Sequence, residues 1–226
     1  MNAITHPAPA FRLSSGSVEL LKWIALVAMV VDHVNAVFFD RSLDWATPVG
    51  RIAFPLFALV VAYNFARPGM DWRGFVRRCV IFGLLALPVH AYLFSIAASW
   101  WPLNILWLFL VAFAVTWAMD REQPELALGI FLVGGALVEY WWPGVGLVVS
   151  LWCWFTAGQR PALLVPVGLS VAGLCVTNGN AWALLVVPLV LLVSQWAPTV
   201  PRSGRFFWWF YPLHLAVIAG MVLTGV

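Results

Sequence analysis

Apolar runs of helix length follow one another along most of this chain, with no long polar run between them. A helix that crosses a bilayer needs about 20 predominantly apolar residues. Of the 226 residues, 63% are hydrophobic and 9% are charged, whereas soluble domains carry roughly 25% charged residues. We therefore expect an all-α, polytopic integral membrane bundle, and the composition excludes an ordinary soluble domain.

The apolar runs predict nine transmembrane helices. They lie at 18–39, 48–66, 74–97, 102–119, 126–141, 144–157, 161–177, 181–197 and 206–224. We expect one transmembrane domain over residues 1–226, with 1–17 as a polar cytoplasmic tail that lacks a cleavable signal-peptide pattern. The pair at 126–157, broken by WWPGVG, is consistent with two tilted spans or with a re-entrant hairpin.

The basic residues predict the orientation, because short cytoplasmic loops carry an excess of Lys and Arg. With the amino terminus inside, nine of the 12 basic residues fall on the cytoplasmic side. These are Arg12, Arg67, Arg73, Arg77, Arg78, Arg121, Arg160, Arg202 and Arg205. Arg41 and Arg51 fall outside, and Lys22 lies within the first helix. Nine helices with the amino terminus inside place the carboxyl terminus outside.

The first helix, LKWIALVAMVVDH, retains Lys22, Asp32 and His33. Ionisable groups inside a membrane are costly and mark functional sites. Lys22 and His33 are 11 positions apart, which is three turns plus about 20° and about 16 Å of rise, so they share one face. Asp32 points about 100° away from His33, towards another helix. Lys22 could instead extend to the lipid headgroups.

The second and last predicted helices add further polar candidates. Arg51, in GRIAFPLF, is a candidate interface anchor, ligand-binding donor or partner for Asp32. The matching membrane depths favour the pairing with Asp32. In FYPLHL, Tyr211 and His214 are three apart and share a face, and Pro212 frees a backbone carbonyl in the same turn.

Other polar and sulfur-containing residues give weaker signals. His90 and Glu139 lie in the outer halves of their helices and could each bond a neighbouring helix or belong to a site. Cys79, Cys153 and Cys175 are widely spaced and form no CxxC pattern. We interpret them as small core residues and expect neither a disulfide nor a metal site.

The segments LKWIALVAMVVDH, GRIAFPLFALVVAYNF and FYPLHL, in this order and spacing, resemble the TraX family of conjugative-pilin acetylases. More distantly, the chain is similar to the acyltransferase-3 superfamily, whose first helix carries a basic residue and a histidine separated by ten positions. Lys22 and His33 have this spacing.

The resemblance implies a membrane-embedded acyltransferase in the bacterial inner membrane. Its donor would be an acyl-CoA, with acetyl-CoA favoured, and its acceptor the amino terminus of a pilin subunit. Expected partners are therefore acetyl-CoA, a pilin and membrane lipids. We expect neither a nucleic acid nor a metal, and the oligomeric state stays open.

The matching residues are put forward by the resemblance, and we hypothesise a role for each from their shared helix faces and common membrane depth. His33 would be the general base, while His214 and Tyr211 would polarise the thioester carbonyl or protonate the leaving thiolate. Asp32 and Arg51 would fix helix positions or receive the acceptor.

The anionic phosphates of the donor would bind at the cytoplasmic side. Lys22 and the loop that ends in Arg77 and Arg78 carry the positive charge for this role. Arg51 is a further candidate for donor binding.

Two other functions remain as alternatives. One is another step of pilin maturation, or a non-enzymatic pilin assembly factor. The other is a proton-coupled transporter or flippase, because intramembrane Asp, His and Glu also serve as proton relays.

Overall fold

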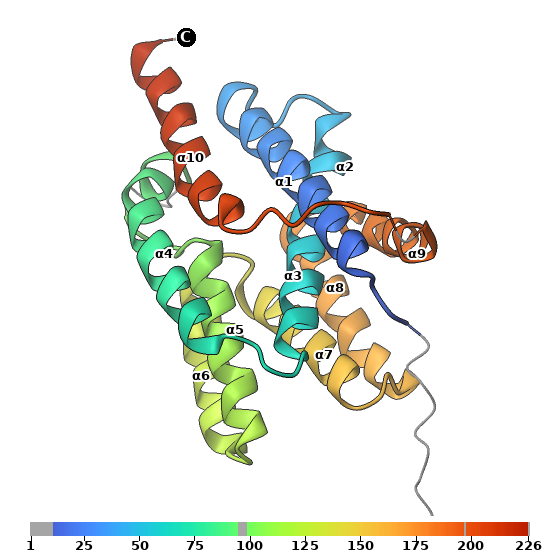
Figure 1. Ribbon diagram of the computed structural model, residues 1–226. Coiled ribbons are helices and arrows are strands. Elements are labelled where there is room, and N and C mark those ends of the chain that lie inside the picture. The colour runs from blue at the N-terminus through green and yellow to red at the C-terminus, as the bar shows by residue number, and fades with distance from the viewer. Residues whose placement is uncertain (1–10, 95–98, 197, 226) are drawn as a thin grey trace, which may run out of the picture.

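The computed structural model describes residues 11–94, 99–196 and 198–225. Within them, the α-helices are α1 (Ser15–Phe38), α2 (Ala46–Arg51), α3 (Ala53–Phe65), α4 (Trp72–Phe94), α5 (Ile105–Asp120), α6 (Pro124–Leu137), α7 (Trp141–Thr156), α8 (Leu164–Asn178), α9 (Val186–Trp196) and α10 (Phe206–Thr224) (Figure 1). Short 3-10 turns, η2 (Pro161–Leu163) and η3 (Trp182–Leu185), precede α8 and α9. The expected all-α class is confirmed. The first ten residues of the expected tail, and residues 95–97 and 197 of two predicted helices, lie outside the described residues.

Helices α2 and α3 form one rod that is interrupted at Ile52. Pro55 supplies the reason, because proline has no N–H and its ring conflicts with the carbonyl four residues earlier, here that of Arg51. Counting these two helices as one, the described residues form nine helical rods. Each rod corresponds to one of the nine predicted segments.

Five helical rods in the described ranges are long and apolar enough to cross a membrane. They are α1, α2 with α3, α4, η2 with α8, and α10. The chain is therefore a multi-pass membrane protein. Helices α5, α6 and α7 have 16, 14 and 16 residues, fewer than the roughly 20 of a perpendicular span. Nine complete spans thus remain a prediction.

The break between α6 and α7 lies earlier than the sequence suggested. Helix α6 ends at Leu137, and WWPGVG forms the beginning of α7 rather than the interruption. Two residues at this junction are in the left-handed region: Tyr140 in the turn (φ 57°) and Trp141 at the start of α7 (φ 53°). An isolated parallel bridge joins Val138 to Leu103, and this bridge ends α6.

Capping side chains explain the beginnings of two other helices. Ser14 caps α1 by accepting from the Ser17 N–H, and Asn104 caps α5 by accepting from the Leu106 N–H. Pro88 is inside α4, which the structure keeps continuous.

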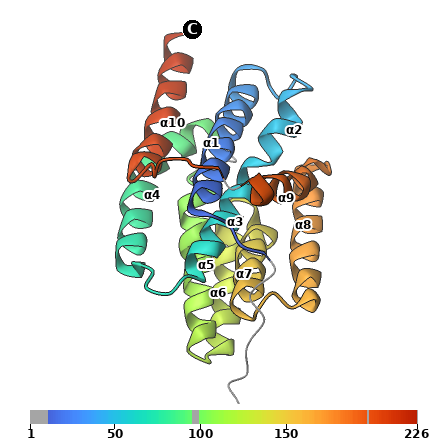
Figure 2. The ribbon, with the colours of Figure 1, turned by 45° about the vertical axis from the view of Figure 1, so that its right-hand side comes forward.

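Six elements surround the centre of the molecule. Helix α10 packs on α4, α4 on α5, α5 on α7, α7 on α3 and α3 on α1. Helices α6 and α8 cover α5 and α7 from outside. In Figures 1 and 2, α1 and α10 occupy the upper part of the view, and α5, α6 and α7 occupy the lower part.

Candidate functional site

His33 on α1 and His214 on α10 form a hydrogen-bonded pair. Nδ1 of His33 lies 2.8 Å from Nε2 of His214. The rings are nearly parallel, at 6°, with centroids 5.0 Å apart. Tertiary packing thus brings together two histidines that the sequence places in the first and last helices.

A backbone carbonyl determines the direction of hydrogen bonding in this pair. Nδ1 of His214 lies 3.0 Å from the Phe210 carbonyl oxygen, which can only accept, so this nitrogen carries a proton. In the neutral ring, Nε2 of His214 then accepts from the Nδ1–H of His33. The hydrogen-bond pattern therefore assigns Nε2 as the unprotonated nitrogen of His33.

A cavity of about 510 Å³, here called the main cavity, lies inside the ring of helices. Lys22, His33 and Tyr211 all line it. Because Lys22 and His33 are three helical turns apart, the main cavity follows α1 for about 16 Å. The shared face expected from the sequence is the face that borders this cavity.

Tyr211 joins the histidine pair from the same helix as His214. Its side chain is buried, and its ring centroid lies 5.6 Å from that of His214. The tyrosine thus brings a hydroxyl-bearing ring to the part of the main cavity that contains His33.

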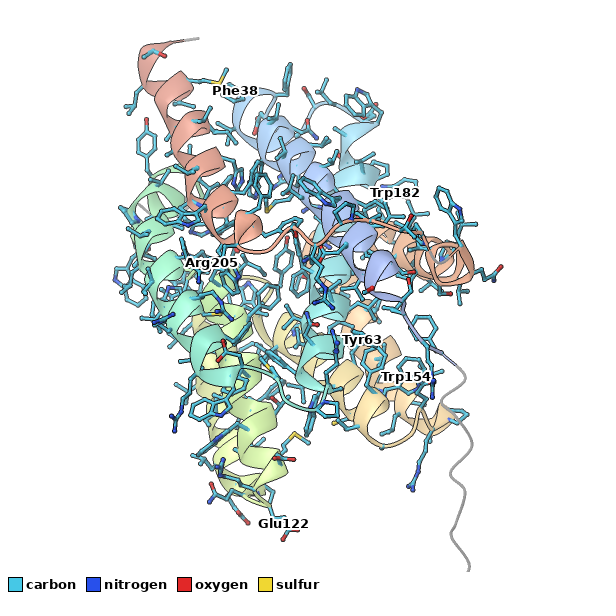
Figure 3. All side chains as sticks on the ribbon, in the orientation of Figure 1. Phe38, Tyr63, Glu122, Trp154, Trp182 and Arg205 are labelled. Atoms are coloured by element: carbon cyan, nitrogen blue, oxygen red, sulfur yellow. The ribbon has the colours of Figure 1, made fainter. Side chains whose placement is uncertain are left out.

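Lys22 is part of a small polar network. Its Nζ lies 2.7 Å from Glu19 Oε1 and 3.2 Å from Ser203 Oγ, and the hydroxyl of Ser203 donates to Glu19 Oε2 at 2.7 Å. Lys22 also lies over the Phe207 ring, 4.8 Å from its centroid. The network connects α1 to the loop before α10. Arg205, labelled in Figure 3, lies directly before the first residue of α10.

Two arginines border the main cavity near Lys22. Arg67 and Arg78 line it, and Arg78 NH1 lies 3.5 Å from Asp71 Oδ2. Arg77 is exposed and is not among the residues that line the cavity in the described part of the chain. Of the two neighbouring arginines proposed for donor binding, the structure brings only Arg78 to the cavity.

Asp32 belongs to a separate cluster at the other end of α1. Its Oδ1 lies 3.6 Å from Arg51 NH1 and 3.1 Å from Arg41 NH1. The geometry agrees with the expected pairing of Asp32 with Arg51, and it shows Arg41 as a second cationic partner of Asp32. Neither Asp32 nor Arg51 is among the described lining residues of the main cavity. The structure therefore does not bring them to the histidine pair.

His90 and Glu139, which gave weak signals in the sequence, form a second polar pair. His90 Nε2 lies 2.8 Å from Glu139 Oε1, and Glu139 lines the main cavity. Two residues without any sequence-based role, Glu19 and Arg41, also form ion pairs. Glu19 could have been found from its i,i+3 spacing to Lys22, whereas Arg41 reaches Asp32 through a loop and left no periodic signal.

A second depression of about 770 Å³, the lateral groove, lies between α1 and α10. Its walls are apolar, with side chains such as Val30, Val34, Leu213 and Val217, and His214 is its one ionisable lining residue among those described. Phe38, at its far end on α1, is labelled in Figure 3. His33 lines the main cavity and His214 lines the lateral groove, so the histidine pair lies between the two.

The comparisons with known proteins cover nearly the whole chain. A family model described as TraX protein matches residues 17–222. The chain belongs to the TraX family. It is 33% identical over 224 residues to Protein TraX of Escherichia coli, covering 93% of this chain and 89% of the relative. Protein TraX of Escherichia coli strain K12 is 32% identical over 227 residues, with the same coverage. No solved structure matches the chain.

Proposed function

We propose that this TraX-family protein is an acetyltransferase of the bacterial inner membrane that transfers an acetyl group from acetyl-CoA to the amino terminus of a pilin subunit. Family membership supports the pilin acceptor. The observation that carries the chemistry is the His33–His214 pair on the wall of the main cavity. The whole chain, 1–226, would act as one domain with its amino terminus in the cytosol.

The donor would enter the main cavity at the end lined by Lys22, Arg67 and Arg78. These cations suit the phosphates of coenzyme A. The narrow pantetheine arm would follow α1, and the thioester would reach His33. To bind Lys22, a phosphate must compete with the carboxylate of Glu19, which lies 2.7 Å from the Lys22 ammonium group.

His33 has the protonation pattern that a general base needs. Aminolysis of a thioester requires a deprotonated amine, and the unprotonated Nε2 of His33 can accept that proton. The amine nitrogen then bonds to the carbonyl carbon, the carbon–sulfur bond breaks, and the nitrogen releases its second proton to water to leave a neutral amide. The proton held by His33 passes to the departing thiolate, so the pair returns to its starting state.

His214 and Tyr211 would assist from α10. His214 orients His33 and stabilises its protonated form. Nε2 of His214 accepts a hydrogen bond from the Nδ1–H of His33, while the Nδ1–H of His214 donates to the Phe210 carbonyl oxygen. Tyr211 could donate its hydroxyl hydrogen to the developing oxyanion. The lateral groove, which reaches His214, offers an apolar path for the membrane-embedded acceptor.

Replacing His33 or His214 by alanine tests this proposal. We expect acetylation of a purified pilin to fall about 10²- to 10⁴-fold for His33→Ala, the usual contribution of a general base, and substantially for His214→Ala. Intact mass of the pilin measures the added acetyl group. Arg121→Ala, on the distant turn between α5 and α6, is the control. Unchanged turnover in both histidine variants, with folding verified by size-exclusion chromatography, would rule out this mechanism.

A further inference from the structure

Glu139 is held at the main cavity by the backbone around it. It lies in the turn between α6 and α7, where its N–H donates to the Leu103 carbonyl at 2.9 Å and the Leu103 N–H donates to the Leu137 carbonyl at 2.8 Å. The next residue, Tyr140, stacks on Phe54 with centroids 4.2 Å apart. These contacts fix the direction in which the turn presents the carboxylate.

His90 holds that carboxylate from α4. Its side chain is 2% exposed, and Nε2 lies 2.8 Å from Glu139 Oε1. A carboxylate only accepts, so Nε2 of His90 carries the proton. Nδ1 of His90 is buried and has no hydrogen-bond partner among the residues that the structure describes. A second proton there would be an unpaired buried donor, so the geometry disfavours a cationic His90 that would balance a Glu139 carboxylate.

The other carboxylates near the main cavity already have full cationic partners. Asp71 pairs with Arg78, and Glu19 pairs with Lys22. Within the described residues, the carboxylate of Glu139 contacts only the imidazole of His90, and a quarter of the Glu139 side chain remains exposed. Glu139 is thus a negative charge at the cavity that no arginine or lysine of the described chain balances.

Phe94 connects this pair to the histidine pair. Its ring lies 5.0 Å from that of His33 and 5.5 Å from that of His90, measured between centroids. His33 and Glu139 also line the same cavity. A group bound by Glu139 would therefore lie on the side of the cavity that contains the unprotonated nitrogen of His33.

We infer that Glu139, positioned by His90, binds a primary ammonium group, which under the proposed function is the amino terminus of the acceptor. An α-amino group has a pKa of about 7.7 to 8.0 and is mostly cationic at neutral pH. The ammonium pairs with Glu139 and gives one proton to His33, and the resulting amine attacks the thioester. As the carbon–sulfur bond breaks, the nitrogen releases a second proton to water and His33 protonates the departing thiolate. The amide that results has no charge and loses the ion pair, so acetylation itself weakens the hold on the product.

Binding of three synthetic peptides tests this inference. The first carries the mature pilin amino terminus, the second is the same peptide acetylated, and the third has a hydroxyl in place of the amine. We expect wild-type protein in nanodiscs to bind the amine form at least about tenfold more tightly than either uncharged form. Equal binding of all three by the wild type would overturn the inference, whatever any variant does.

Glu139→Gln supplies the second arm, because glutamine keeps the size of the side chain and removes its charge. We expect this variant to bind all three peptides alike and to bind acetyl-CoA as the wild type does. A retained preference for the amine would also overturn the inference. The proposed function fails separately, if wild-type protein supplied with acetyl-CoA adds no acetyl group to the pilin while amine preference persists.

Discussion

At the scale of single residues, the site depends on which charges are already satisfied. Lys22 has the spacing to His33 that predicted a donor-binding role, yet it is paired with Glu19 and Ser203. The role of Lys22 therefore depends on competition between a carboxylate and a phosphate for one ammonium group. Both are anions, but a coenzyme A phosphate brings more charge and more acceptor oxygens.

Lys22→Ala separates donor binding from a structural role. If Lys22 binds phosphate, its loss removes a charge-assisted contact, and we expect the apparent KM for acetyl-CoA to rise about tenfold with a smaller change in kcat. Steady-state kinetics with the pilin held at a saturating concentration measure both constants.

Glu19→Gln is the matched control for the Lys22 variant. It breaks the same ion pair but leaves the lysine free, so the KM for acetyl-CoA should not rise. If both variants lower the melting temperature equally and neither changes the KM, Lys22 serves only to fasten α1 to the loop before α10.

At the scale of elements, close packing holds the interrupted rod of α2 and α3 against α1. Gly50 lies against Asp32, and an added Cβ would come within 2.6 Å of the Asp32 Cβ. The absence of a side chain at Gly50 therefore permits the approach that places Arg51 near Asp32. The membrane topology predicted from the sequence placed the two residues at the same depth, but it did not predict the contact between Gly50 and Asp32.

Gly50→Ala should destabilise the protein because the new methyl group must displace Asp32. Overpacking of this kind typically costs about 1 to 3 kcal/mol, which should appear as a lower melting temperature. Gly129→Ala is the control, since an added Cβ there meets nothing within 4 Å and alanine favours a helix. Equal melting temperatures for Gly50→Ala and the wild type would show that α2 can move away from α1 without loss of stability, which would contradict this prediction.

At the scale of the whole molecule, the distribution of charge predicts which loops face the cytosol. The turn that contains Glu122, labelled in Figure 3, would lie inside, and Asn180 between α8 and η3 would lie outside. This orientation gives the Lys22 end of the main cavity access to cytosolic acetyl-CoA.

Cysteine labelling in whole cells tests the orientation. In a chain whose native cysteines are replaced by alanine, Asn180→Cys should react with a membrane-impermeant maleimide added outside. Glu122→Cys should react only after the cells are permeabilised. The reverse pattern would exclude donor entry from the cytosol through the Lys22 end.

Much of the architecture could be predicted from sequence because it depends on local properties. Hydrophobic run length gave nine segments that match the nine rods, and helical periodicity gave the shared face of Lys22 and His33. Boundaries were less certain, as the start of α7 shows, because a left-handed turn and a bridge to Leu103 ended α6 before WWPGVG.

The sequence by itself determined the membrane class, the helical segments and the residues able to do chemistry, since these follow from composition and from neighbours along one helix. Only the tertiary structure decided the partners. It joined His33 to His214, Asp32 to Arg41 as well as Arg51, and His90 to Glu139. The physical reason is that each contact joins groups on different helices or loops, and their packing follows from the fit of whole helix faces.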